Sequence, residues 1–192
     1  MQAKRTSTAR RAILPGVVAA LALALGACGS DDGGSPPPDY SQLQKKAPPP
    51  LADLYKQGDE LISGDSSDVQ AQLDKLKGYP VVMNAWASWC GPCREEFPIF
   101  QKTSAKLGTK IAFLGMNTDD STAAAKTFLD ERPLPYPSFV SDGWDLTDEF
   151  VPGVRGLPKT AFYDRSGERT HVDYLPYTSV DQLQSDIEKY TQ

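Results

Sequence analysis

Cysteine and histidine are scarce in this chain of 192 residues, which contains three cysteines and a single histidine, His171. A structural zinc site needs four ligands, and the chain offers one closely spaced pair, Cys90 and Cys93, with His171 far beyond it. This inventory excludes an ordinary structural zinc site. A copper carrier that uses two cysteines and one histidine stays open as an alternative.

Acidic residues are missing from the start of the chain, where none occurs before Asp31. Basic residues precede the uncharged stretch 12–28, which reads AILPGVVAALALALGAC. This order of charge and apolar residues is typical of a secretory signal. A transmembrane span wants about 20 apolar residues, and this stretch is shorter, with Pro15 and Gly16 near its start.

The apolar stretch ends in LGAC, residues 25–28, which resembles the bacterial lipobox. The resemblance implies that residues 1–27 form a lipoprotein signal peptide and that Cys28 becomes the lipidated first residue of the mature protein. The chain would then be extracytoplasmic and anchored to the bacterial cell membrane. An uncleaved anchor or ordinary cleavage is the alternative.

The charge balance of the mature chain is acidic. Removal of residues 1–27 takes away four of the 20 basic residues and none of the 25 acidic ones, so the formal charge falls from −5 to −9. An acidic surface is a poor match for nucleic acid or anionic headgroups, so we expect no nucleic-acid partner and membrane attachment through the lipid alone. Outside the cytosol, a pair of cysteines persists as a disulfide.

Proline, glycine and serine dominate the stretch after Cys28, so residues 28–50 are predicted to form a disordered tether. Apolar spacing predicts helices over 51–62 and 68–78, and Gly58 weakens the first of these predictions. Further along, compact apolar runs predict strands, periodic segments predict helices, and the turn RSGE separates two strands of a hairpin. The strands are expected at 81–87, 110–117, 159–164 and 169–175, and the helices at 92–107, 121–132, 145–151 and 179–190. This order predicts a single α/β domain with a central sheet and helices on both faces.

The motif WASWCGPC, residues 86–93, places two cysteines at the start of a predicted helix. A disulfide across so small a loop stabilises a fold weakly, because it removes little entropy from the unfolded chain. Cys90 would lie just outside the helix, where unpaired N–H groups and the helix dipole stabilise a thiolate. Cys93, one turn further in, would be shielded and close enough to attack a mixed disulfide on Cys90. The pattern favours a redox reagent over a structural bridge.

At this point a family resemblance is clear: the stretch LKGYPVVMNAWASWCGPCREEFP is similar to the anchored TlpA/ResA-like (DsbE-like) branch of the thioredoxin family. The resemblance covers about residues 68–190. It implies a thioredoxin-like fold over 51–192, with an N-terminal helical extension and a central mixed sheet. It also implies the extra helix and strand of this branch in the long connection 118–156.

The resemblance assigns site residues. GLPKTAFYD matches the stretch that holds the family's cis-proline, so Pro158 should face the cysteine pair, with Gly156 and Leu157 offering backbone to an extended substrate. The other residues expected to bind substrate are those around Cys90, namely Trp89, Gly91 and Pro92. The sequence departs from the family after the last strand, where DYLPYTS lacks the usual glycine, and this departure puts the width of the substrate groove in question.

Acid–base chemistry is expected from Glu96, three residues after Cys93, where the family has a glutamate. The buried aspartate of classical thioredoxins is replaced by Asn84, which cannot exchange a proton. The alternative is that Glu96 is a solvent-facing helix residue like Glu95.

The resemblance implies a thiol-disulfide oxidoreductase without metal or other cofactor, in which Cys90 attacks and Cys93 resolves. The Gly-Pro pair favours reduction of disulfides in exported proteins, such as apocytochrome c. Its partners would be those substrates and a membrane thiol electron donor, and the protein is expected to be a monomer. An oxidase or isomerase, or a copper-binding module that uses the cysteines and His171, is the alternative.

Overall fold

The computed structural model describes residue 2 and residues 39–192, and the predicted signal peptide, Cys28 and the first part of the tether lie outside this range. The sheet has six strands in the order β1-β4-β3-β2-β5-β6. The first four in this order are parallel, whereas β5 runs antiparallel to β2, and β6 to β5. The strands are β1 (Leu61–Ser63), β2 (Val81–Trp86), β3 (Ala112–Thr118), β4 (Ser138–Ser141), β5 (Lys159–Tyr163) and β6 (Arg169–Asp173). The predicted mixed sheet is confirmed.

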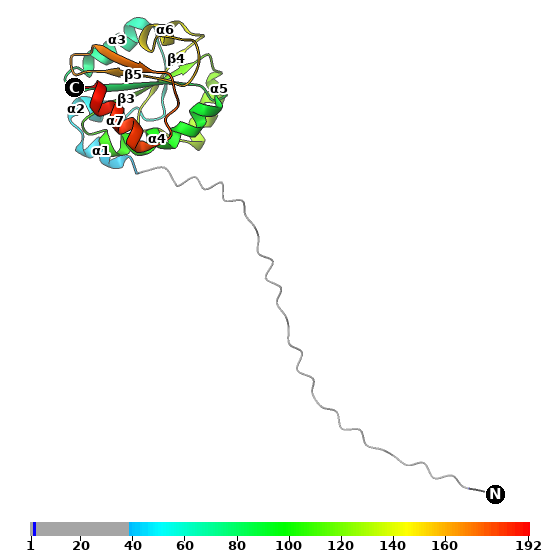
Figure 1. The fold of residues 1–192 in the computed structure, drawn as a ribbon. Helices are drawn as coiled ribbons and strands as arrows, with labels where there is room; N and C mark the ends of the chain where they lie inside the picture. Colours follow the sequence, from blue (N-terminus) through cyan, green and yellow to red (C-terminus); the bar gives the residue numbers. More distant parts are fainter. Residues whose placement is uncertain (1, 3–38) are drawn as a thin grey trace. The chain divides into compact units, whose positions relative to one another are not determined.

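Helices cover both faces of this sheet (Figure 1). The helices α4 (Gly91–Leu107), α5 (Thr122–Glu131) and α7 (Val180–Tyr190) pack on one face, and α3 (Ser66–Lys75) and α6 (Asp145–Phe150) on the other. Aromatic packing joins the helices of the first face to β2. The ring centroid of Phe97 in α4 lies 5.1 Å from that of Trp86 and 4.6 Å from that of Phe128 in α5. This thioredoxin-like arrangement includes β4 and α6, the extra strand and helix expected between residues 118 and 156.

The start of the ordered domain corrects the predicted tether, which was expected to extend to Pro50. Two short helices, α1 (Ser41–Lys46) and α2 (Pro49–Tyr55), pack there, and Leu43 is buried. The Tyr40 hydroxyl donates to the carbonyl of Pro133, far away in sequence. Pro49 and Pro50 occupy the first positions of α2, where proline is compatible with a helix, so the proline-rich composition did not exclude a helix there.

The predicted helix over 51–62 is correct only in its first half. Chain reversal follows α2, where Asp59 has a φ of 60° and its carboxylate accepts a hydrogen bond from the backbone of Leu134. Leu61 and Ile62 then form β1 beside β4. Their apolar spacing fits a helix and a strand equally, and only pairing with a distant segment decides between them.

No helix long and apolar enough to cross a membrane occurs within residue 2 and residues 39–192. The core lies on both faces of the sheet, and every residue of β2, β3 and β5 is buried. The carboxyl end of β2 leads directly to Cys90, so this rigid centre of the sheet positions the cysteine pair.

Candidate active site

The two cysteines form a disulfide at the amino end of α4, with Cα atoms 5.3 Å apart. Cys90 is the N-cap residue, and the backbone N–H of Cys93 donates to its Sγ at 3.2 Å. Cys93 is fully buried, whereas Cys90 keeps 4% of its surface exposed and has Gly91 and Pro92 exposed beside it. Of the two cysteines, Cys90 is therefore the one with surface that a second molecule can reach.

A carboxylate that sequence analysis missed fixes the loop before Cys90. Asp120 accepts hydrogen bonds from the backbone N–H of Ser88 at 2.6 Å and from its hydroxyl at 2.8 Å. Trp89 donates its indole N–H to the carbonyl of Asp119 at 2.9 Å, and 59% of its surface is exposed. The signal in the sequence was a polar run directly after a buried strand. These bonds hold Trp89 open to solvent next to Cys90.

The Leu157–Pro158 peptide bond is cis, as the family resemblance implied. Lys159 pairs with Ala85 in the antiparallel β2–β5 ladder, so the chain at Pro158 lies alongside the end of β2 that leads to Cys90. Gly156 is exposed and Leu157 is partly buried. The predicted substrate-binding segment thus reaches the same end of the sheet as the disulfide.

Glu96 is completely buried, which excludes the alternative of a solvent-facing helix residue; its neighbour Glu95 is exposed. One carboxylate oxygen accepts from the Asn84 amide at 2.9 Å, and the other accepts from the backbone N–H of Tyr177 at 3.0 Å. Burial raises the pKa of Glu96 to about 8, because the loss of water outweighs these two donors. Asp173 raises this pKa further by charge repulsion.

Asn84 connects three parts of the site. Its amide also donates to the Thr160 hydroxyl at 3.2 Å, two residues after Pro158. Through Glu96 it reaches Tyr177 in the segment DYLPYTS that follows β6. The amide therefore joins the helix that carries the cysteines to the strand that begins at the cis-proline.

The segment without the family glycine lies against the segment that precedes the cis-proline. A Cβ atom at Gly153, which has a φ of 115°, would overlap the ring of Tyr174. Leu175 and Val154 are 69% and 77% exposed. Trp89, Val154 and Leu175 are thus exposed apolar side chains on three segments at the end of the sheet that carries the cysteines.

His171 does not join the cysteines. It lies on β6 opposite Phe162, which pairs with Val82, four residues before the end of β2. At about 3.3 Å per residue, this register places His171 roughly 13 Å along the strands from the end of β2 that leads to Cys90. Its ring stacks on Tyr190 with centroids 3.8 Å apart. The geometry contradicts the copper site that would use His171.

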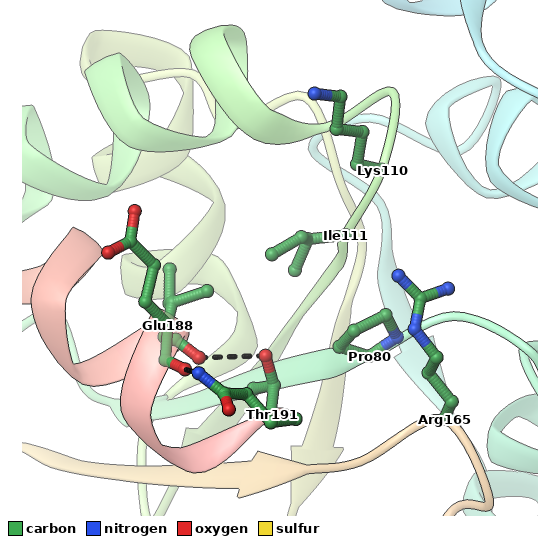
Figure 2. A pocket seen from close by; sticks show the side chains of 8 residues that line it. Pro80, Lys110, Ile111, Arg165, Glu188 and Thr191 are labelled. Atoms are coloured by element: carbon green, nitrogen blue, oxygen red, sulfur yellow. Dashed lines mark hydrogen bonds between the residues drawn. The ribbon is translucent and has the colours of Figure 1, made fainter.

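A hollow of about 510 Å³ lies at the other end of the sheet, and Figure 2 shows its lining. Pro80 and Ile111 precede β2 and β3, and Thr191 follows α7. Cys90 follows the opposite end of β2. This hollow is separate from the candidate active site.

A disulfide at the N-terminus of the helix after the central strand, with a cis-proline leading into the neighbouring antiparallel strand, defines a redox protein of the thioredoxin fold. Residues 42–186 match the Redoxin family, and the chain belongs to that family.

Relatives and solved structures agree with this assignment. The chain is 26% identical over 116 residues to the thiol-disulfide oxidoreductase ResA of Bacillus thuringiensis, covering 60% of this chain and 66% of that protein. It is 35% identical over 111 residues to the thiol:disulfide interchange protein DsbE of Pseudomonas fluorescens, covering 55% of this chain and 56% of DsbE. The matched region spans just under two thirds of ResA and just over half of DsbE.

Among solved structures, a Chlorobium tepidum protein provisionally identified as the thiol:disulfide interchange protein DsbE has a TM-score of 0.56 at 27% identity, covering 62% of this chain and 84% of its own. The structure of dsbF from MTB, in mixed oxidized and reduced forms, has a TM-score of 0.53 at 27% identity, covering 62% of this chain and 85% of its own. The chain is thus similar to the ResA and DsbE group of thioredoxin-type proteins.

Proposed function

We propose that this protein is a thiol-disulfide oxidoreductase that exchanges two electrons through Cys90 and Cys93. The observation that carries the proposal is the disulfide at the start of α4, in which Cys90 keeps 4% of its surface exposed and Cys93 is fully buried. Helix N-terminal N–H groups stabilise the thiolate that attack or departure of Cys90 requires.

In the reducing direction, the Cys90 thiolate attacks one sulfur of a substrate disulfide. A mixed disulfide forms, and the first substrate sulfur leaves as a thiolate and takes up a proton. Cys93 then loses its proton and attacks Cys90, which releases the second substrate sulfur and leaves the Cys90–Cys93 disulfide. The substrate gains two electrons and the pair loses two. A dithiol donor restores the reduced pair by the reverse exchange.

Glu96 is the proposed proton acceptor for Cys93. A buried thiol has a raised pKa, so resolution is slow unless a nearby group takes the proton. A carboxyl whose pKa is about 8 is matched to that task near neutral pH. The redox pair supplies the chemistry without metal or another cofactor.

The proposed substrates are disulfides of exported proteins, with apocytochrome c as the expected example. Support comes from the Gly-Pro pair between the cysteines and from the similarity to ResA and DsbE. The proposed setting is extracytoplasmic, with Cys28 carrying the lipid and a membrane thiol protein as electron donor. The protein would act as a monomer.

The direction of electron flow is tested by the reduction potential of the pair. The protein is equilibrated in buffers of reduced and oxidised dithiothreitol or glutathione, and free thiols are counted. A reductase should lie near the range of about −200 to −270 mV that spans glutaredoxins and thioredoxin. A value near the about −120 mV of the strong oxidant DsbA would overturn the reducing direction and favour oxidation of exported proteins.

A further inference from the structure

Two cations flank the segment that leads into the cis-proline, and both reach one carboxylate on α6. Arg155 donates to Asp148 Oδ2 through Nε at 3.3 Å and Nη2 at 3.1 Å. Lys159, directly after Pro158, places its Nζ 3.9 Å from Asp148 Oδ1. Asp148 therefore contacts the chain on either side of Gly156 and Leu157.

Lys159 is unusual because only 1% of its side chain is exposed. Its Nζ has no hydrogen-bond partner within residues 39–192, and it lies 5.4 Å from the centre of the Trp144 ring. Burial lowers the pKa of Lys159, and the Asp148 carboxylate opposes that shift. The Asp148 carboxylate balances the charge of this buried ammonium, and the attraction draws its Oδ1 toward Lys159.

Arg155 adds the second anchor. An exposed arginine–carboxylate pair alone contributes little, because both side chains lose entropy when they pair. Here the buried ammonium of Lys159, 3.9 Å from Asp148 Oδ1, also attracts the carboxylate, and the guanidinium lies 5.9 Å from the centre of the Trp144 ring. The pair can therefore restrain the backbone around Arg155 at a smaller entropic cost than a free surface pair.

The segment 152–157, which contains Arg155 and ends just before Pro158, has few backbone restraints. Residues 152–157 take part in none of the backbone–backbone hydrogen bonds of the described chain. Val154 is 77% exposed, and Gly153 and Gly156 have φ values of 115° and 156°. A segment of this kind samples many conformations unless side chains hold it.

We propose that Asp148 is a positioning residue that holds the segment 152–157 in the conformation that binds an extended disulfide-bearing polypeptide. Through Arg155 and Lys159 it fixes the backbone at Gly156 and Leu157 before substrate arrives. A preorganised segment binds more tightly, because the cost of ordering it has already been met. This inference rests on the proposed oxidoreductase function.

The test compares two substrates in the full-length protein. One is a synthetic peptide pair joined by a disulfide, which needs the backbone of the segment, and the other is dithionitrobenzoate, a small aromatic disulfide that needs only Cys90. Asp148→Asn should raise the KM for the peptide about 3- to 10-fold while its kcat and the rate with dithionitrobenzoate stay the same. Backbone NMR order parameters at Val154 and Gly156 should fall. Asp148→Glu should restore much of the peptide KM.

Asp148→Asn also leaves Lys159 without its counterion, so the same change is made in a Lys159→Met background, where no buried ammonium is left unpaired. The KM difference between Lys159→Met and the double variant should persist. Asp145→Asn, an exposed change in the first turn of α6, is the matched control and should leave all values unchanged.

Equal peptide KM values with and without Asp148 in both backgrounds would overturn the positioning role, as would an equal loss with dithionitrobenzoate. A protein that exchanges disulfides with neither substrate, in the absence of any substitution, would instead overturn the proposed function.

Discussion

Glu96 is completely buried, although a glutamate side chain is usually exposed to water. Both of its described partners, Asn84 and the Tyr177 backbone, are donors and favour the carboxylate, yet burial favours the neutral acid. The balance lies on the neutral side near pH 7, because burial dominates. The neutral Glu96 carboxyl must therefore lose its proton before it can accept one from Cys93.

The raised pKa of Glu96 predicts a pH dependence of stability. Between about pH 4.5 and about pH 8 the folded protein holds a proton that the unfolded chain has lost, so the free energy of unfolding should fall as pH rises through this window. Glu96→Gln should remove that part of the decline. Urea unfolding of the disulfide-bonded protein at several pH values checks this, with the exposed Glu95→Gln as control. Parallel curves for Glu96→Gln and the unsubstituted protein would contradict the raised pKa.

The same variant tests the proton-acceptor role. Glu96→Gln should slow the resolution of a mixed disulfide by about 10²-fold, with a smaller effect if water substitutes in part. Stopped-flow measurement of thiol release between pH 5 and 9 follows this step. Rates and thiol titration identical to those of the unsubstituted protein would leave Glu96 as a structural residue only.

Residue predictions from the sequence were accurate where a short motif carries the chemistry. The buried Cys93 and the cis bond at Pro158 both lie in such motifs. Asp120 and Asp148 could not be found in this way, because an acidic residue in a polar loop or on a short helix looks like any solvated residue. Their roles depend on partners that the fold brings together.

At the scale of elements, the long periodic segments, the short helix α6 and the hairpin of β5 and β6 were predictable, whereas β1 and α1 were not. The helix α4 and the strands β2 and β3 have strong patterns, and their predicted bounds differ from the structure by one or two residues. Three-residue β1 has too few positions to show a period, α1 lies within a stretch rich in proline and polar residues, and tertiary contacts define both.

The packing of α1 gives a prediction about the edge of the domain. Leu43 is 3% exposed, so Leu43→Ala should lower the free energy of unfolding by about 2 kcal/mol, the lower end for a buried leucine. The exposed Gln42→Ala on the same helix should change it by less than about 0.5 kcal/mol. Denaturant unfolding compares the two. No difference between them would mean that α1 belongs to the tether, as its composition indicates.

At the scale of the whole molecule, the sequence indicates a tethered acidic domain, and the structure describes the domain. The lipidation site at Cys28 is a proposal from the LGAC motif. In a bacterial host, the mature protein should partition into membranes and carry a diacylglyceryl-modified Cys28 by mass spectrometry. Cys28→Ala should release it into the soluble fraction. An unmodified Cys28, or a variant that stays equally bound to membranes, would contradict lipid anchoring.

The positions of the two cysteines, Cys90 at the N-cap of α4 with some exposed surface and Cys93 fully buried, are the basis of the proposed chemistry. If Cys90 attacks and Cys93 resolves, then removing the resolving sulfur must leave a partner attached to the attacking one.

The most direct test is therefore trapping in cells, with covalent adducts resolved on non-reducing gels and identified by mass spectrometry. Cys93→Ser should accumulate mixed disulfides that join Cys90 to exported proteins and disappear on addition of a reductant. Cys90→Ser should accumulate few. Equal adducts from both variants, or none from Cys93→Ser, would contradict the assignment of Cys90 as the attacking sulfur.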